Sequence, residues 1–302
     1  MPEVDSVEYE QAKHLLTPVR VGMDDFFYAD WNMNLYRGCN HGCIYCDSRS
    51  LCYHLDRFDT VRPKENALSL LEGELRTKRK PGITTMGAMS DPYNPLEASL
   101  HLTRGALELM LRYGFGAAFT TKSPLCARDA DLLANISRRA PVCARLTITC
   151  ADDDLCRRIE PHVAPSSQRF AALQQLSEAG VYAGVWLNPV LPYITDTEEN
   201  IISILRQTAA AGGKFVVCFF GMTLRSGNLE YFFDALQRNF PGIREKYLST
   251  FGNAYECGSP DAQRLYDLFK SECTRLGLAW RFHDVNAGMM QHQPQQMTMF
   301  DL

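Results

Sequence analysis

The sequence predicts an α/β protein built as a partial (β/α)6 TIM-like barrel with a C-terminal helical extension. Six strand-like stretches alternate with helical stretches between residues 31 and 222, which is the pattern of parallel β/α units. Six units are too few for the usual closed barrel of eight. The 302 residues are 46% hydrophobic and 22% charged, so the chain can bury a large core as a globular protein.

Residues 1–30 are mixed and polar, and we expect them to form an N-terminal extension with a short helix at Tyr9–Leu16. The core of the barrel is predicted for residues 31–225. Its predicted strands are Trp31–Tyr36, Ile83–Met89, Ala117–Thr121, Val142–Thr149, Val181–Val190 and Lys214–Met222. Its predicted helices are Lys64–Lys80, Thr103–Tyr113, Asp129–Arg139, Ser167–Ala179 and Thr197–Ala211.

Apolar residues at helical spacing predict these helices, and glycine or proline ends most of them, as Gly114 does for the second. Residues 226–290 are expected to form an extension packed on the core. It would contain the helices Asn228–Asn239 and Asp261–Leu276 and a short strand at Ala279–Phe282. Residues 291–302 form a tail rich in Met and Gln.

The most informative motif is a C-x3-C-x2-C loop after the first predicted strand, formed by Cys39, Cys43 and Cys46. Three soft thiolates on one loop suit an iron–sulfur cluster, and they would leave one iron of a four-iron cluster open for chemistry. Structural zinc is the alternative, but it requires four protein ligands, and no second C-x2-C or H-x3-H pair occurs. The other eight cysteines lack such spacing, so no second cluster is expected.

This loop, with the aromatic Tyr45 before its last cysteine, resembles that of the radical S-adenosylmethionine (SAM) superfamily. The resemblance implies a partial barrel and a [4Fe–4S] cluster whose open iron binds the amino and carboxylate groups of SAM. It also implies that SAM is cleaved to methionine and a 5′-deoxyadenosyl radical, and that Tyr45 packs near the adenine. Without the cysteines, Tyr45 would be taken for an ordinary buried aromatic residue.

Further short matches resemble the spore photoproduct lyase branch of that superfamily, in place of the more common Gly-Gly-Glu after the second strand. They are Ser90-Asp91, Thr121-Lys122 and the stretch from Arg158-Ile159-Glu160-Pro161 to Arg169. By this resemblance Ser90 and Asp91 contact SAM, Lys122 pairs with its carboxylate, and Thr149 or a neighbour lines the pocket. The alternatives are that Ser90 and Asp91 only form a turn and that Lys122 is a solvated lysine.

One departure separates this chain from the true lyases. Those enzymes carry a hydrogen-donating cysteine just before the Ser-Asp pair, whereas this chain has Ala88 and Met89 there. We therefore expect no repair of spore photoproduct. Cys150, at a strand end, and Cys257 are candidate hydrogen-atom donors, although a free cysteine is more often a small hydrophobic residue.

The sequence thus predicts an enzyme that abstracts a hydrogen atom from a substrate, with nucleic acid as one expected class. The alternatives are a radical SAM enzyme acting on a peptide or small metabolite, and a non-catalytic metal-cluster module that docks on a DNA-processing complex. A net charge of −4 gives no overall basic footprint for nucleic acid. The resemblance implies an electron donor such as flavodoxin or ferredoxin.

Two expectations concern location and partners. No signal peptide and no apolar run of about 18 residues is present, so we expect a cytoplasmic protein with reduced cysteines and no membrane contact. The segment Gln296–Phe300 resembles the short peptides by which bacterial proteins dock on the replicative sliding clamp. The alternative is a tail that packs on its own barrel.

Overall fold

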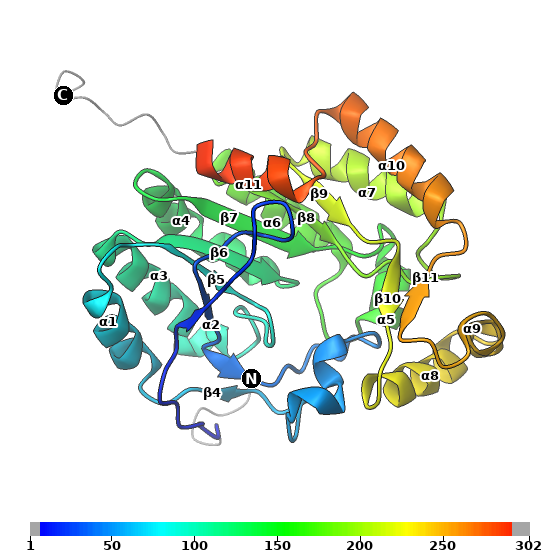
Figure 1. Cartoon of the computed structure of the whole chain (residues 1–302), viewed down its shortest axis with the longest axis horizontal. Helices are drawn as coiled ribbons and strands as arrows, with labels where there is room; N and C mark the ends of the chain where they lie inside the picture. The colour runs from blue at the N-terminus through cyan, green and yellow to red at the C-terminus, as the bar shows by residue number, and fades with distance from the viewer. Residues whose placement is uncertain (1–6, 292–302) are drawn as a thin grey trace.

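The centre of the protein is a seven-stranded sheet, seen in a computed structural model that describes residues 7–291 (Figure 1). In spatial order its strands are β1 (Thr17–Pro18), β2 (Trp31–Met33), β5 (Ile83–Met86), β6 (Gly116–Thr121), β7 (Val142–Thr147), β8 (Ala183–Leu187) and β9 (Val216–Cys218). The strands from β2 to β9 are parallel, and β1 pairs antiparallel with β2. The prediction of an α/β fold with six parallel strands is therefore confirmed.

Two small antiparallel pairs lie outside this sheet. β3 (Tyr36–Arg37) pairs with β4 (Arg62–Pro63), and β10 (Gly221–Thr223) pairs with β11 (Glu256–Gly258). The helices of the described chain are α1 (Ala67–Thr77), α2 (Glu97–Leu100), α3 (Leu102–Tyr113), α4 (Ala130–Ser137), α5 (Asp153–Ile159), α6 (Ser166–Glu178), α7 (Glu198–Ala210), α8 (Asn228–Asn239), α9 (Ile243–Phe251), α10 (Ala262–Leu276) and α11 (Phe282–Gln291). Short 3-10 turns occur at η2 (Asp47–Arg49), η3 (Leu51–Tyr53) and η4 (Pro124–Asp129).

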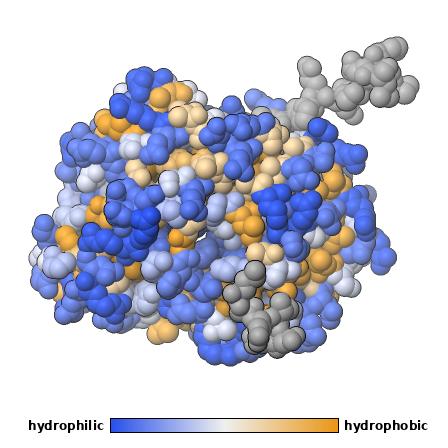
Figure 2. Space-filling view, turned by 180° about the vertical axis from the view of Figure 1, so that it is seen from behind, coloured by the Kyte–Doolittle hydropathy of each residue, from blue (hydrophilic) through white to orange (hydrophobic). Residues whose placement is uncertain are grey.

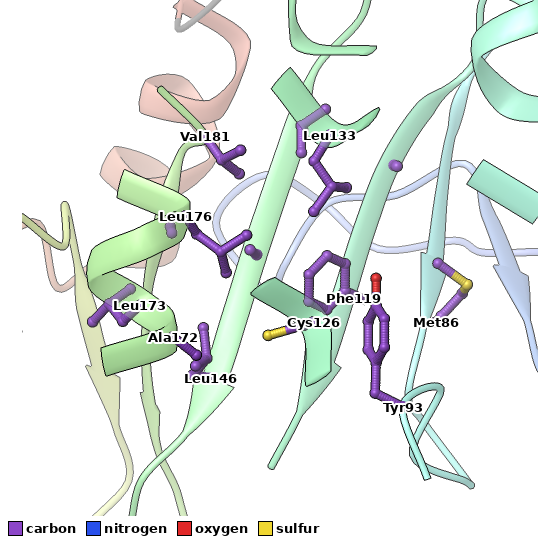
Figure 3. Close-up of a cluster of buried hydrophobic side chains, with 14 of the residues drawn as sticks. Met86, Tyr93, Phe119, Cys126, Leu133, Leu146, Ala172, Leu173, Leu176 and Val181 are labelled. Atoms are coloured by element: carbon purple, nitrogen blue, oxygen red, sulfur yellow. The ribbon is translucent and has the colours of Figure 1, made fainter. Parts of the chain in front are cut away.

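The main hydrophobic core lies between the sheet and the helices that connect its strands. Leu173 and Leu176 of α6 and Leu133 of α4 pack towards Phe119 of β6 and Leu146 of β7, all of them buried (Figure 3). β7 is buried at every position, as expected for a parallel strand that is covered on both faces. From behind, the outer surface is mostly hydrophilic, with scattered apolar side chains (Figure 2).

The predicted helix at Tyr9–Leu16 is wrong. Glu10 forms a bridge with Lys64, and the segment continues extended into β1. The backbone N–H groups of Leu15 and Leu16 donate to the carboxylate of Glu74 on α1, at 3.0 and 2.7 Å. These tertiary contacts hold the segment extended, because a helix of eight residues gains little stability by itself.

The ends of the predicted sheet also differ. The first predicted strand stops at Met33, and Tyr36–Arg37 belongs to β3 in a separate pair. The last one ends at Cys218, after which the chain turns into β10. The predicted strand Ala279–Phe282 is wrong, since only Ala279 bridges to Phe215 and Phe282 begins α11. Helices α2, α5, α9 and α11 were not predicted.

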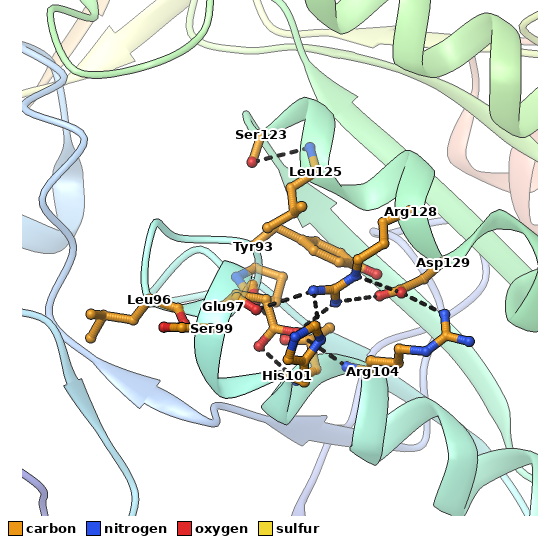
Figure 4. A network of polar contacts seen from close by, with 12 residues as sticks. Tyr93, Leu96, Glu97, Ser99, His101, Arg104, Ser123, Leu125, Arg128 and Asp129 are labelled. Atoms are coloured by element: carbon orange, nitrogen blue, oxygen red, sulfur yellow. Dashed lines mark hydrogen bonds and ion pairs between the residues drawn. The ribbon is translucent and has the colours of Figure 1, made fainter. Parts of the chain in front are cut away.

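A polar network around Glu97, Arg128 and Asp129 joins the connections after β5 and β6 (Figure 4). The buried carboxylate of Glu97 accepts a hydrogen bond from the Tyr36 hydroxyl at 2.5 Å and pairs with Arg128 at 2.7 Å. Tyr36 lies just before the loop, whereas Glu97 lies in the connection after β5. The network therefore holds the start of the cysteine loop against the end of the neighbouring strand.

Among the helices of residues 7–291, none combines the length and the apolar character needed to cross a membrane.

Candidate active site

A cavity of about 670 Å³ opens at the carboxyl ends of the parallel strands. Its wall is formed by the cysteine loop, by residues after β5 and β6, by the ends of β7, β8 and β9, and by the β10–β11 pair. The lining residues used below are Cys39, Cys43, Tyr45, Cys46, Ala88, Met89, Ser90, Asp91, Lys122, Thr147, Trp186, Asn188, Phe219 and Cys257. This is where active sites lie in parallel barrels.

The three motif cysteines line this one cavity, and backbone contacts hold their loop on both sides. The Cys39 N–H donates to the Phe58 carbonyl at 2.8 Å, and the Ile44 N–H donates to the Ile159 carbonyl at 3.0 Å. Gly38 has φ +77° and lies against backbone, since an added Cβ would meet the Thr60 carbonyl oxygen at 2.4 Å. The loop is thus positioned by the fold itself.

The residues fit an iron–sulfur cluster. Three sulfur ligands face the same space, and thiolate sulfur is the usual ligand of such clusters. Burial raises the pKa of Cys39 to about 12 and holds that of Cys43 well above its usual value, so their thiolates form when metal displaces the protons. Within residues 7–291, no three His, Cys, Asp or Glu side chains form a group that could hold one ion. A four-iron cluster does not need such convergence, because each cysteine binds a different iron.

Ser90 and Asp91 both line the cavity, and both are engaged by the protein. The Ser90 hydroxyl donates to the Gly38 carbonyl at 2.6 Å, which ties the end of β5 to the cysteine loop. The Asp91 carboxylate accepts from the Thr121 hydroxyl at 2.6 Å and from the Lys122 backbone N–H at 2.8 Å. Asp91 therefore sets the position of Lys122 by joining the ends of β5 and β6.

Lys122 projects towards the cysteine loop. Its ammonium lies 5.5 Å from the centre of the Tyr45 ring. Burial would lower the pKa of Lys122, but the negative charges of Cys43, Glu160 and Cys46 outweigh it and hold the pKa above its usual value. Within residues 7–291 no carboxylate forms a salt bridge with this ammonium, so a cation is available to an anionic group in the cavity.

Beneath the loop, a buried charged pair supports Tyr45. Glu160 accepts hydrogen bonds from the Tyr45 hydroxyl and from Arg169, and all three side chains are buried. Arg169 also donates to the Thr147 and Ala164 carbonyls, at 2.9 and 2.8 Å. Burial would raise the pKa of Glu160, but Arg169 and Lys122 keep it lowered and the carboxylate ionised. The pair therefore fixes the aromatic ring against the cavity.

The remaining predicted residues separate into two groups. Cys257, on β11, lines the cavity, as do Ala88 and Met89. Thr149 and Cys150 do not line it. The Thr149 hydroxyl contacts Glu160 at 3.4 Å, and the Cys150 thiol points to the Asp152 carbonyl at 3.6 Å, so both lie below the cavity wall.

Sequence reasoning did not select Trp186, Asn188 and Phe219, although all three line the cavity. The available signal was their position, because they follow or end the fifth and sixth parallel strands. Asn188 carries a carboxamide and Trp186 an indole N–H, but the two aromatic residues have the sequence character of core residues.

A family model described as the radical SAM superfamily matches residues 33–205. The chain belongs to this superfamily, whose members are enzymes that use a [4Fe–4S] cluster with SAM, and these are the cofactors of this chain. When bound, they supply an organic radical that can take a hydrogen atom from a substrate. The site shown here would hold them through Cys39, Cys43 and Cys46 and beside Lys122.

Among curated proteins, an uncharacterized protein of Mycobacterium tuberculosis (strain ATCC 25618 / H37Rv) is 32% identical over 224 residues. That alignment covers 72% of this chain and 66% of the relative, so this chain spans just under two thirds of the relative's length. The radical SAM Nalpha-GlyT isomerase of Pseudomonas phage M6 is 21% identical, over 80% of this chain and 51% of that protein.

Solved structures show the same fold. Spore photoproduct lyase with bound AdoMet and dinucleoside spore photoproduct has a TM-score of 0.61 at 15% identity, covering 83% of this chain and 75% of that one. The radical SAM methyltransferase TsrM from Kitasatospora setae has a TM-score of 0.54 at 12% identity, covering 81% and 51%. The expected partial-barrel fold is confirmed by these likenesses.

Proposed function

We propose that this protein cleaves SAM reductively in the cavity and uses the resulting radical to abstract a hydrogen atom from a substrate bound there. One observation carries the proposal: the three motif cysteines, Tyr45 and Lys122 line a single cavity at the carboxyl ends of the strands. The cysteines supply ligands, and Lys122 supplies a cation suited to the SAM carboxylate.

The side chains around the cavity would act by holding the cysteine loop and the cofactors in position. Ser90 and Asp91 support the SAM side of the cavity by fixing the loop and Lys122, whose ammonium is directed to the region beside the cysteines. Tyr45 lines the cavity, and its hydroxyl is held by Glu160. Apolar groups such as Met89 and Trp186 reduce water access, which protects a radical from side reactions.

The substrate class that we favour is nucleic acid. Support comes from one solved structure of the same fold, spore photoproduct lyase, which holds a dinucleoside spore photoproduct. Cys257 is the candidate for returning a hydrogen atom to the substrate radical, because Cys257 lines the cavity whereas Cys150 does not. Thr149 would contribute through Glu160 and not by direct contact.

Anaerobic reconstitution with iron and sulfide, followed by dithionite and SAM, tests the function directly. We expect 5′-deoxyadenosine and methionine in equal amounts, with none from the variant Cys43→Ala. Stoichiometric zinc with no iron after reconstitution, or SAM that stays intact with a fully loaded cluster, would contradict the proposal.

Two partner expectations stay predictions. Reduction requires an electron donor, for which flavodoxin or ferredoxin are candidates. Sliding-clamp docking by Gln296–Phe300 concerns residues outside the described range.

A further inference from the structure

The end of the molecule opposite the cavity carries a concentration of arginines. They are exposed at the carboxyl ends of three helices, α1, α3 and α4, and in the connections that lead from these helices into β5, β6 and β7. These residues, called the arginine patch below, are Arg76, Arg79, Arg112, Arg138 and Arg139. The cavity opens at the carboxyl ends of the strands, whereas the patch lies at their amino ends, so the two are separate surfaces.

Backbone contacts bring the three connections together. The Gly116 N–H donates to the Gly82 carbonyl at 3.0 Å, and the Ala117 N–H donates to the Pro141 carbonyl at 3.0 Å. α1 packs on α3 and α3 packs on α4, so the three helices lie side by side along the sheet (Figure 1). Because packed helices are about 8–10 Å apart, the patch extends over roughly 16–20 Å.

Few acidic groups oppose these charges. Within residues 7–291, Arg112 is the only one of the five arginines that forms an ion pair, with Glu72 at 3.0 Å. Asp30 lies against Gly82 in the connection to β5, and the exposed Lys80 in the same connection offsets its charge. The patch therefore carries a net positive charge, although the whole chain has a net charge of −4.

The helix dipole explains only part of this arrangement. A cation in the last turn of a helix is stabilised by the carbonyl groups there, which accounts for Arg76 and Arg112. Arg79 and Arg139 lie beyond the ends of α1 and α4, where this effect has faded. α6, which leads into β8, ends with Glu178 and not with a cation. Helix stability alone therefore does not require the full set of arginines.

The patch offers charge without an apolar surface. None of the large apolar side chains exposed in residues 7–291 lies on α1, α3 or α4 or in the connections that follow them. The aromatic ring at this edge is that of Trp31, and the ammonium of Lys78 lies over it at 3.7 Å from the ring centre. A protein partner would need an apolar centre in its interface, and a single strand would need open rings for stacking. Neither is present here among the described residues.

We propose that the arginine patch binds the phosphate backbone of a double-stranded nucleic acid, without regard to base sequence. A duplex presents one negative charge per about 1.7 Å of its axis, so several phosphates fall within the length of the patch. Arginine pairs with a phosphate through parallel N–H donors, which lysine cannot do. This inference goes beyond the proposed function, because the contact lies away from the cavity and does not involve SAM.

An anionic membrane is the competing surface for exposed arginines. Stable membrane binding takes a second signal besides a basic patch, such as an inserted apolar side chain or a lipid anchor. The patch carries no exposed large apolar side chain among residues 7–291. A duplex needs no such insertion, and it is therefore the partner that the patch fits.

Fluorescence anisotropy of the complete, cluster-loaded protein tests this contact. The probe is a labelled DNA duplex of about two helical turns, in two unrelated sequences, measured at about 50 and 200 mM KCl. We expect both sequences to bind alike and to weaken with salt, with a logarithmic slope of about −0.9 for each phosphate contact. Tighter binding to vesicles of phosphatidylcholine and phosphatidylserine, or to a polyglutamate peptide, would overturn the proposal, as would a strong preference for one sequence.

Paired variants locate the contact. Arg138→Gln with Arg139→Gln should weaken duplex binding at least about tenfold at low salt and reduce the salt slope by about 2. Arg138→Lys with Arg139→Lys keeps both charges and should retain the salt slope. The control, Arg238→Gln with Lys270→Gln, removes the same charge from exposed positions on α8 and α10 and should bind within about twofold of the parent. If the glutamine variant of the patch binds like this control, the patch is not the contact.

A second pair guards against a variant that fails to fold. Arg76→Gln with Arg79→Gln, at the other end of the patch, should weaken the duplex in the same way, with circular dichroism to confirm the fold. SAM cleavage by the parent is measured in parallel. If the parent binds the duplex through these arginines but leaves SAM intact, the proposed function is wrong and the patch stands. If the parent cleaves SAM but does not bind the duplex, only the patch is wrong.

Discussion

Glu160 accepts a hydrogen bond from the hydroxyl of Tyr45, so a carboxylate at the end of α5 holds the aromatic residue of the cysteine loop. The two residues are 115 positions apart in sequence, and both are buried. Arg169 pairs with the same carboxylate from α6. The connection after β7 therefore supports a loop that follows β2.

We predict that Glu160→Gln lowers the free energy of unfolding by about 3–5 kcal/mol, because it leaves Arg169 as a buried charge without its partner. Urea unfolding of the protein without metal measures this loss. Glu178→Gln, on the exposed end of α6, is the matched control and should cost less than about 0.5 kcal/mol. Equal stability of the Glu160 variant and the parent would show that the pair is not coupled to folding.

The second prediction concerns the cluster. Replacing Cys39, Cys43 or Cys46 by Ala should each abolish the visible cluster absorbance and reduce iron from about four per chain to near zero. Cys52→Ala is the control, since Cys52 is exposed, lies six residues beyond the motif and does not line the cavity. Retention of the full iron content in any of the three motif variants would remove that cysteine from the ligand set.

The third prediction distinguishes the role of Lys122 in SAM binding from that of Asp91. Lys122→Met removes the cation while keeping the length of the side chain, so SAM affinity should fall at least tenfold with iron content and stability unchanged. Lys80→Met, at an exposed position, should bind SAM like the parent. Equilibrium dialysis with labelled SAM measures both. Unchanged affinity of the Lys122 variant would place the SAM carboxylate elsewhere.

Asp91→Ala should behave differently, which is the fourth prediction. Its carboxylate accepts three hydrogen bonds, from Tyr93, Thr121 and Lys122, so its loss should weaken SAM binding and also lower the stability by about 1–3 kcal/mol. Thermal unfolding followed beside the dialysis measurement shows whether both change. A loss of SAM binding at parental stability would indicate direct contact in place of positioning.

The fifth prediction is that the purified protein does not reverse dinucleoside spore photoproduct to thymines. Ala88 and Met89 line the cavity before the Ser-Asp pair, and neither carries a transferable S–H. Product analysis by mass spectrometry after an anaerobic reaction decides this. Clean repair would contradict it, and loss of that repair in Cys257→Ala but not in Cys150→Ala would identify Cys257 as the donor.

The parallel strands could be predicted because local signals agree with the tertiary structure. Val142–Thr147 is mostly apolar and lies inside the sheet, buried at every position, and Gly114 ends α3 in the left-handed conformation that its lack of a side chain allows. The cysteine loop was equally clear, because its spacing is set by the cluster and not by distant contacts. In contrast, the extended segment before β1 depends on Glu74, which no local pattern reveals.

Site residues that depend on packing were harder to assign. Asp91 was expected to face SAM, and only the structure shows that Thr121 and Lys122 occupy its oxygens. Phe219 has the sequence character of a core residue, and its exposure follows from the turn that separates β9 from β10. Cys150 and Cys257 could not be ranked from sequence, because the difference between them is which one reaches the cavity.

The pairing of β10 with β11 brings Glu256, Cys257 and Gly258 into the cavity wall from beyond residue 250. The superfamily match ends at residue 205, so these residues and Phe219 lie outside it. Part of the cavity wall is therefore encoded outside the stretch that carries the cysteine loop and Lys122. Exchanging the C-terminal stretch would reshape this part of the cavity while the cysteine loop stays in place.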